Sequence, residues 1–380
     1  MYSLPQSYNQ TSKCKRCISS NAYKEWDEQL FKNIIINLRL IKPLPFGFLY
    51  YNYMKKVSVI TPIYNVEHFI AHCVVTLMQQ TLDEVEYIFV NDATPDNSIR
   101  ILKEALENFP EKLSQVKILT HEENQGLPAA RNTGLKVATG KYIFHCDSDD
   151  FMEPDTLKVL YDTAEEQDAD YVWCDYFIAS TNDSQYKKQR EYKNKDQALR
   201  GVLCGDMVYN VWNKLVRKDL YDNNDITFPA GHAMGEDMTM IMLLACASKV
   251  AFVHYGGYHY VTTNPMALTK KYSDDRSIND LKYNVQRTAD FISKKFGDTY
   301  TYETNCFKLN LKWFFLAFSD KIKSYKLWYE SFPEANQCIF RRNVSLRVKL
   351  VEWCASKRLF WLVKLHYLLV IKFFYTITGK

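Results

Sequence analysis

The sequence predicts an α/β fold with a mainly parallel, Rossmann-like sheet flanked by helices and followed by a helical C-terminal extension. Short β-branched and aromatic runs alternate with segments of helical periodicity from residue 54 to about residue 178. Such alternation implies right-handed crossovers between parallel strands. Polar residues also follow several of these runs directly, as expected at the carboxyl edge of an open sheet.

The strands and helices follow one another in order along the chain. The first strand, 57–61, is expected to end at Pro62, where a backbone donor is lost. The helix after it has one apolar face that includes Ile70 and Leu77. The five expected strands cover residues 57–61, 85–90, 116–120, 142–146 and 171–178. The expected helices cover residues 67–80, 97–109, 126–138, 155–167 and 238–247.

Composition narrows the class of protein. The chain has 380 residues, 47% hydrophobic and 24% charged, which fits one large or two modest globular domains. Its formal net charge of +4 is too small for this size to indicate a nucleic-acid partner. Its 10 cysteines are scattered, several inside apolar runs, which favours the reducing cytoplasm over a disulfide framework. The N-terminus lacks the layout of a signal peptide, and no apolar run reaches the roughly 18 residues of a spanning helix.

The chain divides into three expected regions. Residues 1–53 are polar and turn-rich and form an appendage, 54–270 form the working domain, and 271–380 are helical with a basic end. At about 100° per residue, Lys357, Lys364 and Lys372 fall in one stripe of a helix that is otherwise largely apolar. This predicts peripheral contact with the anionic inner face of the plasma membrane. The alternative is a helix packed into its own protein or a partner, with lysine stems along apolar surface.

One buried strand ends abruptly in carboxylates. The run 142–146 is followed by Asp147, Ser148, Asp149 and Asp150. Unpaired carboxylates are very costly inside a sheet, so they belong at its carboxyl edge. A bend that brings Asp147 and Asp149 together would make an oxygen site for Mg²⁺ or Mn²⁺, with positions left for substrate phosphates. The alternative is a strand that ends in a solvated acidic turn.

Two further polar loops fall on the same edge. Thr61, Pro62, Tyr64 and Asn65 follow or end the first strand, and Asp92 follows the second. Tyr64 offers a face for stacking, and Asp92 offers an acceptor for a base N–H. Taken singly, Asp92 could form a turn and Tyr64 could pack at a rim. Together, the three loops predict a nucleotide crevice with a metal at its mouth.

These motifs resemble the family 2 glycosyltransferases of the GT-A fold. Residues 57–65 with Glu67 are similar to the family's opening strand, and residues 90–96 to its Val-Asp-Asp-Gly-Ser-x-Asp loop. The block 124–134 matches its Asn-x-Gly and Ala-Arg-Asn-x-Gly motifs, and Asp147-Ser-Asp149 matches its Asp-x-Asp. The resemblance covers about residues 55 to 270. Two positions depart from it: Asn91 replaces the first Asp of the second loop, and Ala93 replaces its Gly.

The resemblance implies a role for each matching position. Asp92 would bind the base, Asp147 the ribose or the metal, and Asp149 the metal on the donor diphosphate. The donor-binding side as a whole would comprise Thr61, Pro62, Tyr64, Asn65, Glu67, Asp92, Arg131, Asp147 and Ser148.

An acidic pair begins a later apolar helix. Glu236 and Asp237 resemble the element that carries the family's general base, which would be Asp237. A sugar hydroxyl needs such a carboxylate to accept its proton in the transition state. The alternative is that both acids merely complement the helix N-terminus. Lys214 and Arg217, which precede this pair, are expected to be ordinary surface cations. The alternative is that they approach the donor diphosphate.

The expected function is an inverting, metal-dependent glycosyltransferase that uses a nucleotide sugar, preferably a UDP-sugar, and a glycan or lipid-linked acceptor hydroxyl. Processive synthases of the same fold carry several membrane spans and a Gln-x-x-Arg-Trp motif, and the sequence contains neither. Transfer of one sugar per encounter is therefore expected. The alternative from another class is a non-catalytic nucleotide-sugar-binding subunit of a glycan assembly complex.

Overall fold

The computed structural model describes residues 55–181, 183–267, 275–317 and 321–372. The expected appendage, residues 1–53, lies outside these residues, as does the end of the chain after residue 372.

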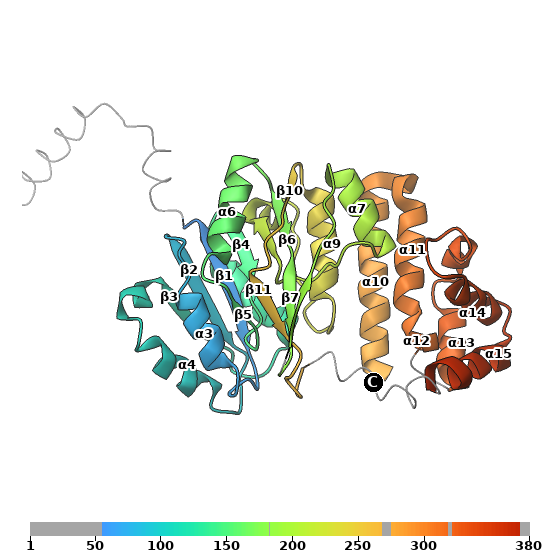
Figure 1. The fold of residues 1–380 in the computed structure, drawn as a ribbon, viewed down its shortest axis with the longest axis horizontal. Helices are drawn as coiled ribbons and strands as arrows, with labels where there is room; N and C mark the ends of the chain where they lie inside the picture. The colour runs from blue at the N-terminus through green and yellow to red at the C-terminus, as the bar shows by residue number, and fades with distance from the viewer. Residues whose placement is uncertain (1–54, 182, 268–274, 318–320, 373–380) are drawn as a thin grey trace, which may run out of the picture. The chain divides into compact units, whose positions relative to one another are not determined.

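A seven-stranded sheet lies at the centre of the described chain (Figure 1). Its strand order is β10-β6-β9-β4-β1-β2-β3. All neighbouring pairs are parallel except those that β9 makes with β4 and β6. The mainly parallel α/β fold is therefore confirmed. The strands are Val57–Ile63 (β1), Val85–Asn91 (β2), Val116–Thr120 (β3), Tyr142–His145 (β4), Tyr171–Cys174 (β6), Lys214–Arg217 (β9) and Val250–Val253 (β10).

Strand β1 runs through Pro62 to Ile63, so the prediction that it ends at residue 61 is wrong. The Ile60 carbonyl faces β4, where it accepts from the Cys146 N–H at 3.1 Å. Because alternate residues of a strand face the same neighbour, the Pro62 nitrogen also faces β4. It lies beyond His145, the last β4 residue that pairs with β1. No ladder hydrogen bond is lost there, and the proline is tolerated.

Strand β9 is an insertion that the sequence did not predict. It lies antiparallel between β4 and β6, although its four residues begin and end with cations. Lys214 is only 1% exposed, so the prediction of a surface cation is wrong at this position. Its ammonium donates to the side-chain carbonyl of Asn213. A charged residue at a central sheet position is unusual and depends on such a partner.

A smaller sheet of four strands, in the order β5-β11-β7-β8, adjoins the first. The predicted strand 171–178 is in fact two strands, β6 and β7, which belong to different sheets. The buried carboxylate of Asp175 separates them and accepts hydrogen bonds from the Tyr186 hydroxyl at 2.7 Å and the Gln189 N–H at 2.5 Å. The strands are Phe151–Met152 (β5), Tyr176–Ala179 (β7), Ser184–Lys187 (β8) and Tyr258–Val261 (β11).

Helices pack on the large sheet. Helix α5 packs on β1 and β2, and α6 packs on β6, β9 and β10. The five predicted helices are all present, with ends that differ from the predictions by one to three residues. The helices up to residue 246 are Ile70–Met78 (α3), Ser98–Leu106 (α4), Leu127–Val137 (α5), Thr156–Glu166 (α6), Lys195–Cys204 (α7), Lys218–Asp222 (α8) and Glu236–Cys246 (α9).

The predicted helical C-terminal region is confirmed and packs directly on the sheet domain. Helix α10 lies against α9, and α11 lies against α7 (Figure 1). A second core surrounds Trp328 and Tyr325, and the Lys312 ammonium lies 3.9 Å from the centre of the Trp328 ring. The helices are Asp275–Phe296 (α10), Thr301–Lys312 (α11), Phe314–Ala317 (α12), Ile322–Glu330 (α13), Leu346–Ser356 (α14) and Phe360–His366 (α15).

The expected basic stripe on one C-terminal helix does not exist, because the helix is interrupted. Arg358 has a φ of 60° and ends α14. Lys357 is the last residue before this break, and Lys364 lies in α15. Helical periodicity therefore does not place these two lysines on one face. The side chain of Lys372 lies outside the described residues.

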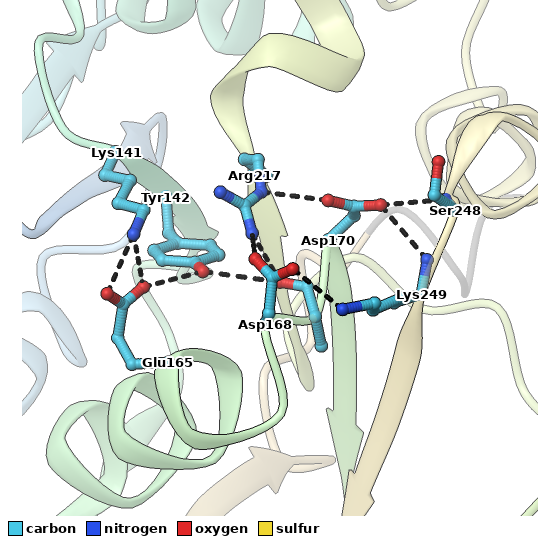
Figure 2. Close-up of polar contacts among 9 residues, drawn as sticks. Lys141, Tyr142, Glu165, Asp168, Asp170, Arg217, Ser248 and Lys249 are labelled. Carbon is cyan, nitrogen blue, oxygen red and sulfur yellow. Dashed lines mark hydrogen bonds and ion pairs between the residues drawn. The ribbon is translucent and has the colours of Figure 1, made fainter.

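Charged side chains fasten β9 at the end of the sheet opposite the carboxyl ends of its parallel strands (Figure 2). Arg217, the last residue of β9, pairs with Asp168 at 3.1 Å and Asp170 at 2.9 Å. Lys249 pairs with Asp168 at 2.8 Å, and the Ser248 N–H donates to Asp170 at 2.7 Å. Arg217 is therefore not an isolated surface cation. It ties the inserted strand to the turns that precede β6 and β10.

Candidate active site

A pocket of about 300 Å³ opens at the carboxyl ends of β1, β2 and β4 and beside the first turn of α9. We name it the edge pocket. Of the predicted site residues, Thr61 is buried in β1 and Glu67 lies outside the lining. The others all line the pocket: Pro62, Tyr64, Asn65, Asp92, Arg131, Asp147, Ser148, Asp149 and Asp237.

Hydrogen bonds join the loop after β1 to the loop after β2. The Thr94 hydroxyl accepts from the Asn65 N–H at 2.9 Å, and the Asp96 carboxylate accepts from the Glu67 N–H at 3.0 Å. The Glu67 carboxylate accepts in turn from the backbone and side-chain amides of Asn97, both at 3.0 Å. In this structure Glu67 thus fixes the two loops against each other.

The loop after β2 has a left-handed backbone at Ala93, the position where the family that this chain resembles has a glycine. Ala93 has a φ of 51°, in the left-handed region that costs a residue with a Cβ about 1 kcal/mol or more. Asn65 in the facing loop has a φ of 54°, which asparagine tolerates better. The departure at residue 93 therefore leaves the turn in place, at a cost to stability.

Asp92 is buried and fully hydrogen-bonded within the protein. Its Oδ1 accepts from His121 Nδ1 at 2.7 Å and the Gln125 N–H at 2.8 Å. Its Oδ2 accepts from the Asn124 side-chain amide at 3.0 Å and the Gly126 N–H at 2.8 Å. These donors fill the roughly four acceptor positions of a carboxylate. Asp92 therefore fixes the start of α5, and a base would have to displace one of these donors to bind it.

Tyr258 fixes the bend that separates the acids after β4. The Asp147 N–H donates to the Tyr258 hydroxyl at 3.0 Å, and that hydroxyl donates to Asp150 at 2.6 Å. Asp150 also accepts from the Val261 N–H at 2.7 Å and is buried. Asp147 and Asp149 both line the edge pocket.

Asp149 is held by Asn264, whose amide donates to Oδ2 at 2.7 Å. Burial and the negative charge of Asp147 raise the pKa of Asp149 to about 6. A cation between the two carboxylates would relieve this repulsion. Among the described residues, no three or more His, Cys, Asp or Glu side chains form a complete metal site. Mg²⁺ commonly takes one or two carboxylates together with substrate phosphates, so Asp147 and Asp149 fit an ion shared with a diphosphate.

Arg131, on α5, supplies a positive charge beneath these carboxylates. Its side chain is buried, and Nη2 donates to Asp147 Oδ1 at 2.5 Å. Burial alone would lower the pKa of Arg131, but the charges of Asp147 and Glu236 raise it. Nε and Nη1 have no hydrogen-bond partner within the described part of the chain. Arg131 therefore stays charged and orients Asp147.

The first turn of α9 brings Asp237 into the edge pocket. Its Oδ1 accepts from the Val211 N–H at 3.0 Å. Burial and the charge of Asp147 raise the pKa of Asp237, and burial and the charge of Asp237 raise that of Glu236. Burial also lowers the pKa of Lys214 to about 7. A half-buried carboxylate with a raised pKa is suited to accept a proton near neutral pH.

Among the pocket residues that escaped prediction are Trp212, Tyr260 and Asn264. Trp212 stacks on Tyr260 with ring centres 5.3 Å apart, and both line the pocket beside Asn264. They come from chain segments that reach the pocket only because β9 and β11 lie where they do. Their place in the pocket depends on these long-range contacts, so the sequence did not single them out as site residues.

Comparisons with known proteins agree with this geometry. The family model for glycosyl transferase family 2 matches residues 58–236. The uncharacterized glycosyltransferase EpsJ of Bacillus subtilis (strain 168) is 32% identical over 222 residues, which cover 56% of this chain and 63% of EpsJ. The glycosyltransferase GlyG of Streptococcus pneumoniae serotype 4 is 30% identical over 216 residues, 54% of this chain and 70% of GlyG. The match to EpsJ thus spans less than two thirds of that relative.

The fold is also found in solved structures. S. aureus TarS 1–349, in complex with UDP-GlcNAc, matches with a TM-score of 0.64 at 20% identity, over 82% of this chain and 91% of that one. This likeness confirms a GT-A fold. The segment that the family model matches includes the loops after β1, β2 and β4 and stops in the first turn of α9, so it contains most of the residues that line the edge pocket. The chain therefore belongs to glycosyltransferase family 2.

Proposed function

We propose that this protein is an inverting, metal-dependent glycosyltransferase that moves a sugar from a nucleotide sugar to a hydroxyl of a glycan or lipid-linked acceptor. The observation that carries the proposal is the meeting of Asp147, Asp149 and Asp237 in one pocket at the carboxyl edge of the sheet. Because TarS was solved with UDP-GlcNAc, UDP-sugars are the first donors to test.

Asp147 and Asp149 would hold Mg²⁺ or Mn²⁺. When bound, the ion offsets the negative charge that develops on the departing nucleoside diphosphate. Arg131 fixes Asp147 and Asn264 fixes Asp149, so both carboxylates are oriented before the donor arrives. Such preorganisation avoids a reorganisation cost during the reaction.

Asp237 would accept the proton of the acceptor hydroxyl. The hydroxyl oxygen forms a bond to the anomeric carbon while the bond from that carbon to the diphosphate oxygen breaks. Direct displacement of this kind inverts the anomeric centre. The backbone bond from Val211 holds Oδ1 of Asp237 at 3.0 Å, and the raised pKa makes the carboxylate a stronger base than an exposed aspartate.

Hydrolysis of a panel of nucleotide sugars by the full chain tests this proposal. We expect one donor to be turned over in the presence of Mn²⁺, with the activity lost on addition of EDTA. UDP binding by calorimetry without turnover, even with acceptor present, would instead support a non-catalytic nucleotide-sugar-binding subunit. Absence of both turnover and binding would contradict both functions.

We also propose that α14 and α15 contact the anionic inner face of the plasma membrane. Apolar side chains at helical spacing are exposed on both helices. On α14, Leu346 is 65% exposed and Leu350 47%, while on α15 Trp361 is 66% exposed and Leu365 44%. None of the described helices is long and apolar enough to cross a bilayer.

The charges around these side chains favour an anionic surface as the partner. Between residues 340 and 372 the sequence contains one acid, Glu352, which is fully buried and paired with Arg342. Exposed cations remain, including Arg347 and Lys364. An apolar helix face whose exposed charges, within residues 340–372, are all cationic fits the headgroup region of an anionic bilayer.

Vesicle sedimentation tests the membrane contact. The wild type is expected to bind phosphatidylglycerol-containing vesicles at low salt and to bind pure phosphatidylcholine weakly. The double variant Leu350→Ser/Leu365→Ser is expected to bind about tenfold more weakly, because less apolar surface leaves water. Leu113→Ser is a matched control, since Leu113 is 48% exposed and lies outside α14 and α15. A wild type that ignores anionic vesicles would overturn the proposal.

A further inference from the structure

A second cavity, of about 610 Å³, lies beside the edge pocket, and Asp149 belongs to the lining of both. We name it the side cavity. Its walls come from the segment 68–72, from β5 and β11, and from the end of β7 with the turn into β8. The transfer chemistry proposed above uses none of these residues except Asp149. The side cavity thus adjoins the edge pocket at Asp149 and has no assigned ligand.

Strand β11 and the residues after it form the partition between the two cavities. Successive residues of an extended chain point to opposite sides. His259, Val261 and Thr263 line the side cavity, whereas Tyr260 and Asn264 line the edge pocket. A molecule that passes Asp149 would therefore have one end in each cavity.

The side cavity combines aromatic side chains with hydroxyl groups. Phe151 stacks on His259 with ring centres 4.3 Å apart, and His72 meets Phe151 edge-on at 4.6 Å. Because His259 lies stacked between Phe151 and Phe177, its ring faces are occupied. A sugar here would be held chiefly by protein hydroxyls and carboxylates, which pair with sugar hydroxyls. The hydroxyl-bearing residues in the lining are Ser180, Thr181, Ser184 and Thr263.

The charge of the lining distinguishes between classes of acceptor. Among the described residues, no lysine or arginine lines the side cavity, whereas the carboxylates of Asp149 and Asp183 do. Binding a phosphate would require cations or free backbone donors, and the carboxylate of Asp183, which lies outside the proposed metal site, would repel it. A neutral sugar meets no such penalty, because carboxylates accept hydrogen bonds from its hydroxyl groups.

We propose that the side cavity binds an uncharged sugar unit of the acceptor, so that the acceptor is a neutral glycan and not a polyol-phosphate chain. This inference rests on the proposed function, because a sugar bound here is an acceptor only if the edge pocket binds the donor. Asp149 stands where the two ligands meet.

Ligand-observed NMR with the full chain tests the proposal. The probes are methyl glycosides of neutral hexoses and N-acetylhexosamines, with glycerol 3-phosphate as the anionic comparison, at pH 8, where histidine is ordinarily uncharged. Ser184→Trp places a large ring in the cavity at an exposed strand position, and Ser114→Trp is the control at an exposed site outside both cavities. UDP binding in each sample reports whether the edge pocket is folded.

A neutral glycoside is expected to bind Ser184→Trp about tenfold or more weakly than it binds the wild type, because the added ring fills the space for the sugar. The control is expected to match the wild type, and glycerol 3-phosphate is expected not to bind. Neutral glycosides that bind Ser184→Trp equally well, or that fail to bind a UDP-competent wild type, would overturn the inference and leave the proposed function standing. Binding of glycerol 3-phosphate that Ser184→Trp abolishes would contradict the neutral class. A wild type that does not bind UDP would instead remove the proposed function.

Discussion

Asp149→Asn is expected to lower donor turnover by about two to four orders of magnitude, since the charge stabilisation of a bound ion is worth several kcal/mol. The asparagine keeps an oxygen that can accept the 2.7 Å hydrogen bond from Asn264 but loses the negative charge. Donor hydrolysis measured against Mn²⁺ concentration should show a response in the wild type and none in the variant.

The same substitution is expected to increase the free energy of unfolding at pH 7 by about 1 to 3 kcal/mol. The pKa of Asp149 in the folded state, about 6, lies above its ordinary value of 3.8. Ionisation therefore opposes folding: the penalty is absent below the ordinary pKa, grows between the two values and is complete above the raised one. Urea denaturation without metal measures it.

Asp162→Asn serves as the control for both measurements. Asp162 is a half-buried acid on α6 that pairs with Lys158 and lies outside the lining of both cavities, so its loss should leave turnover unchanged and alter stability by less than about 0.5 kcal/mol. An Asp149→Asn protein that kept its turnover and its response to Mn²⁺ would remove Asp149 from the metal site.

Asp237→Asn is expected to lower the turnover number by about two to four orders of magnitude, with UDP affinity changed by less than about threefold. The Val211 N–H, which donates to Asp237 at 3.0 Å in the wild type, can still donate to the asparagine oxygen. The asparagine side chain, however, cannot accept a proton. Steady-state transfer and UDP calorimetry separate the two effects. Wild-type turnover should also decrease as the pH falls through the raised pKa of Asp237, because the protonated acid cannot act as the base.

Glu236→Gln distinguishes between the two acids of this turn. Glu236 is 7% exposed, and its Oε2 is buried without a hydrogen-bond partner within the described part of the chain. The neutral glutamine side chain should fit in place of Glu236, and the loss of turnover should be smaller than the loss that Asp237→Asn causes. The reverse order would make Glu236 the base.

The strand-end loops were predictable because local patterns determine them. Each of these central strands is a short apolar run followed by an acid that cannot lie unpaired inside the sheet, so Asp92 and Asp147 were expected at one edge of the sheet. The sequence pattern did not predict which residues donate hydrogen bonds to each acid. The carboxylate of Asp92 accepts hydrogen bonds from residues of the loop before α5. The carboxylate of Asp150 accepts one from the hydroxyl of Tyr258, 108 residues away in sequence.

Strand β9 could not be predicted from the sequence, and the reason is physical. Periodicity marks a strand only when its buried positions are apolar, and Lys214 breaks that rule at a central position of the sheet. Asp175 breaks it again, because a buried carboxylate splits one apparent strand into two. The interruption of the C-terminal helix at Arg358 likewise depends on one non-glycine residue in the left-handed region, which composition does not reveal.

Strand β11 restricts which insertions and deletions the two cavities can tolerate. Its residues serve the two cavities in turn, so the insertion of one residue would move His259 and Val261 to the edge pocket and Tyr260 to the side cavity. Point substitutions can alter either cavity alone. Insertions, deletions and recombination within this strand preserve both only when they change its length by an even number of residues.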